Sequence, residues 1–218
     1  MILHRTAPIA ALLAALVAAS GTARAQGERA GDFDYYVLSL SWSATWCNLT
    51  GDDRADPQCD SGRGLDFTLH GLWPQNDQGY PSYCRTGQPD PTRSETAAMS
   101  DIMGGAGLAF YEWKKHGRCS GLSPRAYFAT SRRAHDSVTT PPVLQGLSKR
   151  IELPASVIED AFIEANPQLS RNGITVTCDG GMIEEVRICL TRDLEPRDCG
   201  PDVRRDCTLS DAVIEPVR

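Results

Sequence analysis

The chain has 218 residues, with 22 Lys and Arg against 28 Asp and Glu, and a formal net charge of −6. A protein with an acidic surplus does not coat nucleic acid non-specifically, so any polyanionic substrate must be held by a local cationic site. Beyond its N-terminal segment the sequence has no long apolar stretch, which argues against a membrane protein.

The N-terminal segment has the pattern of a secretory signal peptide over residues 1–25. His4 and Arg5 precede an apolar run over residues 9–19, and Ala23-Arg24-Ala25 provides a small-x-small cleavage site. The run is too short to span a bilayer, which makes a membrane anchor the weaker alternative. We therefore predict cleavage near Ala25, a bacterial-type secreted or periplasmic protein without a membrane anchor, and a single domain over residues 26–218.

Two strands are predicted before the first helices. Tyr35–Trp42 is rich in β-forming residues and alternates partly, and Asp66–Leu72 reads as a second strand that ends in a turn at Trp73-Pro74. The stretches 50–64 and 76–92 are rich in Asp, Gly or Pro and are predicted to be loops.

Helices are predicted in the middle of the chain and strands again near its end. Prolines at first turns, and Gly or Pro beyond the last turns, help to define helices over Ser94–Met103, Leu108–His116, Pro124–His135 and Pro154–Asn166. Ile174–Cys178 and Met182–Leu190 have strand character, and Gly180-Gly181 between them indicates a hairpin. Strands at both ends with helices between them predict an α+β fold, a central antiparallel sheet packed with several helices.

All eight cysteines follow the predicted cleavage site. An even number of cysteines in an exported chain indicates disulfides. A metal site is the weaker alternative, because no Cys-x-x-Cys is present and His116 with Cys119 cannot supply a site alone. We therefore predict no metal and no cofactor, and assign a structural role to Cys47, Cys59, Cys84, Cys119, Cys178, Cys189, Cys199 and Cys207.

Two histidine segments form the candidate site. His70 stands at the end of a predicted strand in a run from Phe67 to Gln75, FTLHGLWPQ. His116 ends a predicted helix in YEWKKHGRC, where Glu112, Lys115 and His116 share one helix face. Imidazole titrates near neutral pH, so one neutral and one protonated histidine can remove one proton while delivering another. Lysine can stabilise negative charge that develops on a phosphoryl group.

Residue by residue, structural interpretations remain open. His135 stands in an Arg-rich stretch beside Asp136, and we interpret it as structural. Glu112 and His116 could form an ordinary pair on a helix surface, worth a few tenths of a kcal/mol. Trp73, taken alone, is more often a core residue than a base-stacking one.

The two segments resemble the active-site segments of the ribonuclease T2 family. They are His70-Gly71-Leu72-Trp73-Pro74 and the run from Glu112 to Cys119, EWKKHGRC. They occur in the family's order, with a cysteine in the interval between them, and the run from Tyr36 to Cys47 resembles the family's first strand and following cysteine. The resemblance implies a metal-independent endoribonuclease that acts on single-stranded RNA but not DNA, with low base specificity, as a monomer.

The resemblance also implies residue roles. His116 would act as general base on the 2′-hydroxyl and His70 as general acid for the leaving 5′-oxygen, with a 2′,3′-cyclic phosphate as intermediate. Glu112 and Lys115 would stabilise the pentacovalent phosphorane. Trp73 would stack on a base, with Tyr80 or Tyr83 as a second wall. The implied disulfides are Cys84–Cys119 and Cys47–Cys59, with a nested set of Cys178–Cys207 around Cys189–Cys199.

The sequence departs from the family at Tyr111, where members commonly carry a phosphate-binding histidine. A phenol can donate a hydrogen bond to phosphate but supplies no positive charge near neutral pH. We expect weaker phosphate affinity or turnover rather than loss of activity, with Lys114 or Arg118 as possible compensating charges.

Three other functions agree less well with the sequence. Tyr111 is the only support for a secreted RNA-binding or toxin-like effector with weakened catalysis. A two-histidine phosphoesterase requires paired His-x-Ser/Thr motifs, which His70-Gly71-Leu72 and His116-Gly117-Arg118 do not provide. A metal-dependent nuclease needs a cluster of carboxylates or histidines that the sequence pattern does not indicate.

Overall fold

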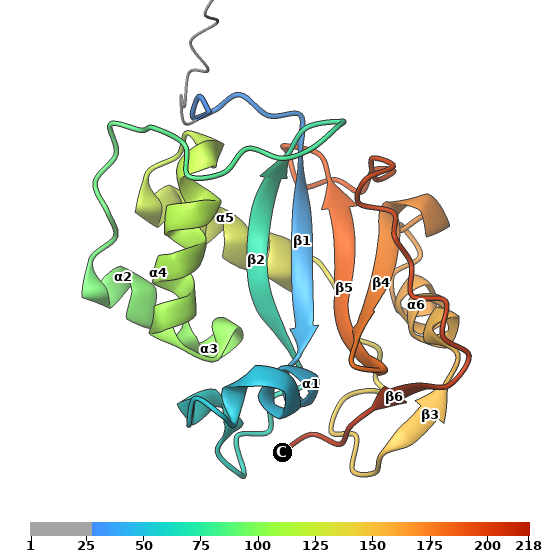
Figure 1. The fold of residues 1–218 in the computed structure, drawn as a ribbon. Helices are drawn as coiled ribbons and strands as arrows, with labels where there is room; N and C mark the ends of the chain where they lie inside the picture. The colour runs from blue at the N-terminus through green and yellow to red at the C-terminus, as the bar shows by residue number, and fades with distance from the viewer. Residues whose placement is uncertain (1–27) are drawn as a thin grey trace, which may run out of the picture.

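The computed structural model describes residues 28–218, and the signal peptide predicted over residues 1–25 lies outside them. At the centre, β1 (Tyr35–Trp42) pairs antiparallel with β2 (Phe67–Gln75) on one side and with β5 (Met182–Leu190) on the other. The other side of β5 pairs with β4 (Ile174–Asp179). These strands stand in the middle of Figure 1, with helices on both sides, so the predicted α+β architecture is confirmed.

The hairpin between β4 and β5 forms where the sequence predicts it. Its turn is Gly180-Gly181, with φ of 54° and 80°, a left-handed conformation that glycine adopts without steric cost. Asp179 pairs with Met182 across the turn.

Strand β2 is longer than predicted, and the expected turn at Trp73-Pro74 is wrong. The strand continues to Gln75, with Val37 opposite Trp73 and Tyr36 opposite Pro74. Proline lacks an N–H donor and is tolerated in a strand at the edge of a sheet. β2 pairs only with β1 among the described strands, which explains why Pro74 does not end it.

Two three-residue strands were not predicted. β3 (Ile151–Leu153) and β6 (Ala212–Ile214) pair antiparallel. Val213 of β6 pairs parallel with Met182 of β5, so the sheet is mixed rather than wholly antiparallel as predicted. Strands this short present too few residues for a periodic pattern.

Three of the predicted helices appear within two residues of their expected ends: α4 (Ala106–Lys115), α5 (Pro124–Asp136) and α6 (Ala155–Ala165). The predicted helix Ser94–Met103 is instead divided into α2 (Arg93–Ala97) and α3 (Ser100–Met103). Met99 lies at the break, and both Met99 and Met103 are buried. The division of the segment thus accompanies burial of both methionines in the core, a tertiary contact that helix propensity alone does not include.

Short helical turns complete the described part. Between β1 and the first predicted loop (50–64), the chain forms α1 (Ser43–Trp46) and a π-helical turn over Cys47–Gly51 that runs into the start of that loop. Three 3-10 turns cover Pro57–Cys59, Gly117–Ser120 and Arg171–Gly173.

The helices cover the sheet and fix its position. α4 packs against β2, α5 against β1 and β2, and α6 against β4. The Tyr127 hydroxyl on α5 donates a hydrogen bond to the Leu72 carbonyl of β2 at 2.9 Å. Leu69 and Leu72 of β2 are fully buried, so one face of this strand is anchored in the core while its other side chains are free to form a site.

Four disulfides join the pairs that the family resemblance implied. They are Cys47–Cys59, Cys84–Cys119, Cys178–Cys207 and Cys189–Cys199. Cys84–Cys119 links the loop after β2 to the turn that follows α4, close to both histidine segments.

Within residues 28–218, no helix is both long enough and apolar enough to cross a membrane.

Candidate active site

Strand β2 and helix α4 bring the two histidine segments together. His70 lies on β2 at an irregularity of the sheet: Ser39 of β1 pairs with Gly71, but the next residue, Leu40, pairs with Leu69. His70 is thus the extra residue of a β-bulge, a feature that turns a side chain away from the ordinary alternation of a strand. His116 is the residue at which α4 ends.

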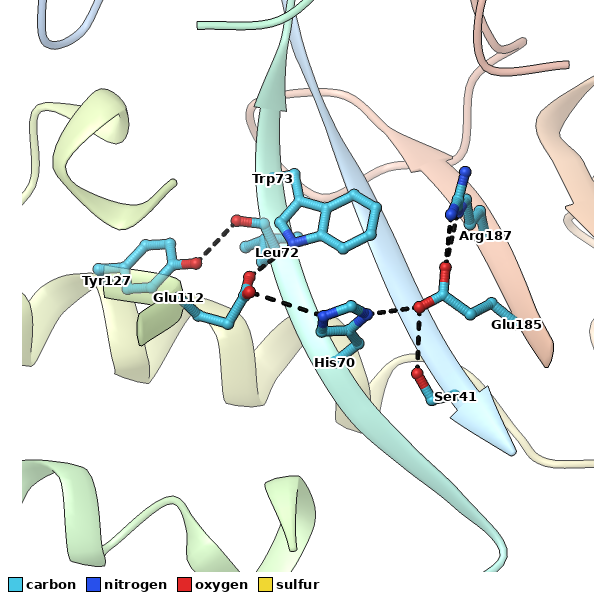
Figure 2. Close-up of polar contacts among 8 residues, drawn as sticks. All are labelled: Ser41, His70, Leu72, Trp73, Glu112, Tyr127, Glu185 and Arg187. Atoms are coloured by element: carbon cyan, nitrogen blue, oxygen red, sulfur yellow. Dashed lines mark hydrogen bonds and ion pairs between the residues drawn. The ribbon is translucent and has the colours of Figure 1, made fainter. Parts of the chain in front are cut away.

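Two carboxylates flank the ring of His70 (Figure 2). Nδ1 hydrogen-bonds to Oε1 of Glu185, and Nε2 lies 3.6 Å from Oε1 of Glu112. Desolvation opposes a charge on the ring, but the hydrogen bond to Glu185 and the negative charges of Glu185 and Glu112 outweigh it and raise the pKa of His70. His70 is therefore suited to hold a proton near neutral pH.

Glu112 is buried on α4 and bonds across to β2. Its Oε2 accepts a hydrogen bond of 2.6 Å from the Trp73 indole. Desolvation raises the pKa of this carboxyl, although His70, Trp73 and Lys115 oppose the shift. Since Glu112 and His116 are both buried and Glu112 bonds to Trp73, the two do not form the ordinary surface pair that the sequence left open.

His116 lies in an environment opposite to that of His70. Its ring is buried and stacks on Trp73, with ring centroids 5.2 Å apart. Within residues 28–218 its Nδ1 has no hydrogen-bond partner. Desolvation, together with the charges of Lys115 and His70, lowers the pKa of His116 to about 3. His116 is therefore neutral at the pH at which His70 is protonated.

Both histidines line one cavity of about 430 Å³. Lys115, Arg187 and Arg205 give it cationic groups, beside the carboxylates of Glu112 and Asp202. These cations are local groups that can contact a polyanion although the protein as a whole is acidic. Trp73 and Tyr80 are the aromatic residues of its wall. The four residues predicted as catalytic, His70, Glu112, Lys115 and His116, all line this cavity.

A second cavity, of about 580 Å³, is also lined by His70. Tyr111 lines it and is 46% exposed. The Lys115 ammonium lies 5.7 Å from the centre of the Tyr111 ring. The position that departs from the family pattern therefore lies near Lys115 and shares a cavity with His70.

Other sequence candidates lie elsewhere. His135 on α5 pairs with Asp136 at 3.0 Å, and it borders a different cavity. Lys114 pairs with Asp90 at 3.0 Å, which makes it a poor source of compensating charge for Tyr111.

Sequence reasoning missed Glu185, Arg187 and Ser41. Arg187 binds Oε2 of Glu185 through Nε at 2.8 Å and Nη2 at 2.6 Å, and the Ser41 hydroxyl donates to Oε1 at 3.1 Å (Figure 2). One signal in the sequence could have pointed to Glu185 and Arg187. Charged residues interrupt the strand MIEEVRICL, and a charged side chain in the middle of a sheet requires a partner.

Comparison with known proteins gives consistent matches. The model of the Ribonuclease T2 family matches residues 33–199. A protein named "Ribonuclease" from Aeromonas hydrophila is 46% identical over 104 residues, which cover 48% of this chain but only 45% of that protein, so the match spans less than half of the relative. Ribonuclease I of Escherichia coli is 27% identical over 84% of this chain and 86% of its own length.

The fold also matches solved structures. An RNase-related protein from Calystegia sepium superposes with a TM-score of 0.65 at 22% identity, over 85% of this chain and 97% of that one. At this identity the match shows a shared fold.

Proposed function

This chain belongs to the ribonuclease T2 family, and on that premise we propose that it is an endoribonuclease that cleaves single-stranded RNA by metal-independent acid–base catalysis. One observation supports the proposal above all. A single cavity is lined by two histidines whose pKa values are shifted in opposite directions, up for His70 and down for His116. Paired groups with opposed shifts are typical of an acid and a base that act together.

In the proposed first step, neutral His116 removes the proton of the ribose 2′-hydroxyl. The 2′-oxygen attacks phosphorus while the bond from phosphorus to the 5′-oxygen breaks, and His70 delivers its Nε2 proton to that leaving oxygen. The products are a 2′,3′-cyclic phosphate and a free 5′-hydroxyl, and slower hydrolysis opens the ring. DNA lacks the 2′-hydroxyl and is not cleaved.

Lys115 is proposed to act on the phosphoryl group, and Glu112 to hold the two histidine segments around it. The ammonium of Lys115 offsets the negative charge that grows on the non-bridging oxygens. Buried Glu112, whose pKa is raised by desolvation, accepts from Trp73 and faces Nε2 of His70. It fixes the geometry in which the two segments meet the phosphate.

Trp73 and Tyr80 are proposed to contact a nucleobase. Tyr80 is 51% exposed, and its ring centroid lies 6.0 Å from that of His116. Stacking is sequence-tolerant because every base has a π-face, which agrees with the low base specificity that we propose.

An assay on the purified mature protein tests this function. Homopolymer RNAs and a DNA control are incubated in EDTA, and cyclic-phosphate products are followed over a range of pH. We expect RNA but not DNA to be cleaved, and His70→Ala and His116→Ala each to lose activity by about 10²–10⁴-fold. Dependence on added metal, or full activity of either variant, would refute the mechanism. Binding of RNA without cleavage would favour the effector alternative.

We also propose that the protein is exported after cleavage near Ala25. The prediction depends on the leader sequence alone. The N-terminal sequence of protein recovered from the periplasm or the medium would begin at Gln26, whereas an intact leader on the recovered protein would contradict it.

A further inference from the structure

The carboxylate of Glu185 lies on the side of His70 that faces away from Glu112. Nδ1 of the ring bonds to Glu185, whereas Nε2 faces Glu112, a residue of the cavity wall (Figure 2). Burial raises the pKa of Glu185. The hydrogen bond and charge of His70, together with the ion pair to Arg187, outweigh this effect and lower the pKa to about 2. The carboxylate is therefore an acceptor only, and Nδ1 must be the donor.

Glu185 is itself held rigidly. It is 3% exposed and lies on β5, which pairs with β1 on one side and β4 on the other. Arg187 donates twice to its Oε2, and Ser41 of β1 donates to the same Oε1 that accepts from His70. Both oxygens are thus held by groups from β5 and β1, so the acceptor for Nδ1 of His70 has a fixed position.

We propose that Glu185 is a positioning residue for catalysis: it fixes the orientation and tautomer of His70 and keeps the ring protonated, so that Nε2–H is presented to the leaving 5′-oxygen. This inference rests on the proposed function. During cleavage the Nε2 proton passes to the 5′-oxygen as the phosphorus–oxygen bond breaks, while the Nδ1 proton stays on the ring. Glu185 neither gains a proton nor touches the substrate. A carboxylate behind an imidazole acts in this way by orienting it and stabilising its charged form.

The charges that face His70 come from two elements besides its own. Glu185 and Arg187 extend from β5, and Glu112 extends from α4. The Arg187 guanidinium opposes protonation of His70, whereas both carboxylates favour it. His116 follows α4 and is neutral when His70 is charged. Removal of Glu185 therefore leaves His70 with one carboxylate and an opposing guanidinium.

Two substrates with different leaving groups separate this role from a merely structural one. A dinucleoside monophosphate needs a general acid, because its leaving group is an alkoxide. A nucleoside 3′-(4-nitrophenyl phosphate) does not, because nitrophenolate leaves unprotonated. We expect Glu185→Gln to lower kcat/KM on the dinucleotide by about 10²-fold and to leave turnover of the nitrophenyl ester nearly unchanged.

The matched control is Glu184→Gln, which removes the same charge one residue away. The Glu184 carboxylate accepts from Thr177 instead. We expect this variant to cleave both substrates as the wild type does. Retained turnover of the nitrophenyl ester in Glu185→Gln also shows that its site is folded.

The pKa of His70 gives a second, independent readout. Only three histidines remain in the mature chain, so their NMR titrations are readily resolved. We expect Glu185→Gln to lower the pKa of His70 and to move the basic limb of the dinucleotide pH–rate profile to lower pH. If Glu185→Gln does not fold, Glu185→Asp takes its place: it keeps the negative charge but withdraws the carboxylate from Nδ1 of His70, and a loss confined to the dinucleotide is again expected.

The outcomes are distinct. An equal loss on both substrates, no loss on either, or an unchanged pKa of His70 in Glu185→Gln would overturn the role of Glu185. A wild-type protein that fails to cleave RNA would instead overturn the proposed function.

Discussion

Gly71 lies where no side chain fits beside the carboxylate of Glu112. A Cβ at position 71 would be 2.2 Å from Oε2 of Glu112 and 2.4 Å from Nε1 of Trp73. These two atoms form the hydrogen bond that joins α4 to β2 at the site. Absence of a side chain at Gly71 therefore allows the two histidine segments to approach one another.

Gly71→Ala is expected to weaken both stability and activity. The new methyl group must push Glu112 or Trp73 aside, and over-packing of this kind costs about 1–3 kcal/mol. Thermal unfolding and kcat/KM on RNA measure the two effects. Gly87→Ala is the control, because nothing lies within 4 Å of its Cβ. Wild-type activity in Gly71→Ala would show that the bond between Glu112 and Trp73 is dispensable.

The pH dependence of kcat/KM follows from the two shifted histidines. The base, His116, must be unprotonated, and its pKa of about 3 places the acidic limb far below neutrality. The acid, His70, must be protonated, and its raised pKa moves the basic limb above the ordinary histidine value. We expect a broad plateau that extends well into acidic pH. An acidic limb near about pH 6.5 would contradict this assignment of the base.

Tyr111→His is expected to improve phosphate binding. Tyr111 is adjacent to Lys115 and lines a cavity with His70, so a protonated imidazole there would add a charge-assisted hydrogen bond. A charge-assisted hydrogen bond gains about 1 kcal/mol over a neutral one, which should lower KM roughly fivefold. The gain should appear below about pH 6.5, where the new imidazole is protonated.

Tyr111→Phe is the matched control, because it removes the hydroxyl and adds no charge. Its KM should rise slightly at every pH. If Tyr111→His shows no gain at acidic pH, the charge is supplied elsewhere or is unnecessary.

The disulfide Cys84–Cys119 is expected to support both stability and catalysis. It closes a separation of 35 residues, and its removal by paired Ala substitutions should cost about 3–4 kcal/mol. Beside the disulfide, the Tyr83 amide donates a hydrogen bond to the Lys115 carbonyl at 2.8 Å. Loss of the disulfide should therefore also loosen the end of α4 and lower kcat.

Removal of Cys178–Cys207 is the control for that experiment. It closes a separation of 29 residues and should cost similar stability, but it anchors β4 rather than α4. Urea unfolding and kcat, both measured well below the unfolding temperature, separate the effects. Equal losses of kcat in the two double variants would show that the bridges act on stability alone.

The amino-acid sequence by itself determined the chemical groups of the site. Each histidine segment is short and continuous, so the spacing of Glu112, Lys115 and His116 on a helix is a local property. The bounds of β1 and β5 were equally local, because β-forming residues define them. The structure brings all four predicted catalytic residues to one cavity.

Only the tertiary structure decided what surrounds His70. Glu185 is 115 residues away in the sequence, and the contact depends on β1 lying between β2 and β5 in one register. The bulge that turns His70 out of the strand alternation, and the edge position that lets Pro74 remain within β2, are properties of strand pairing. Register arises from the packing of strands that are distant in the chain, and no single segment encodes it.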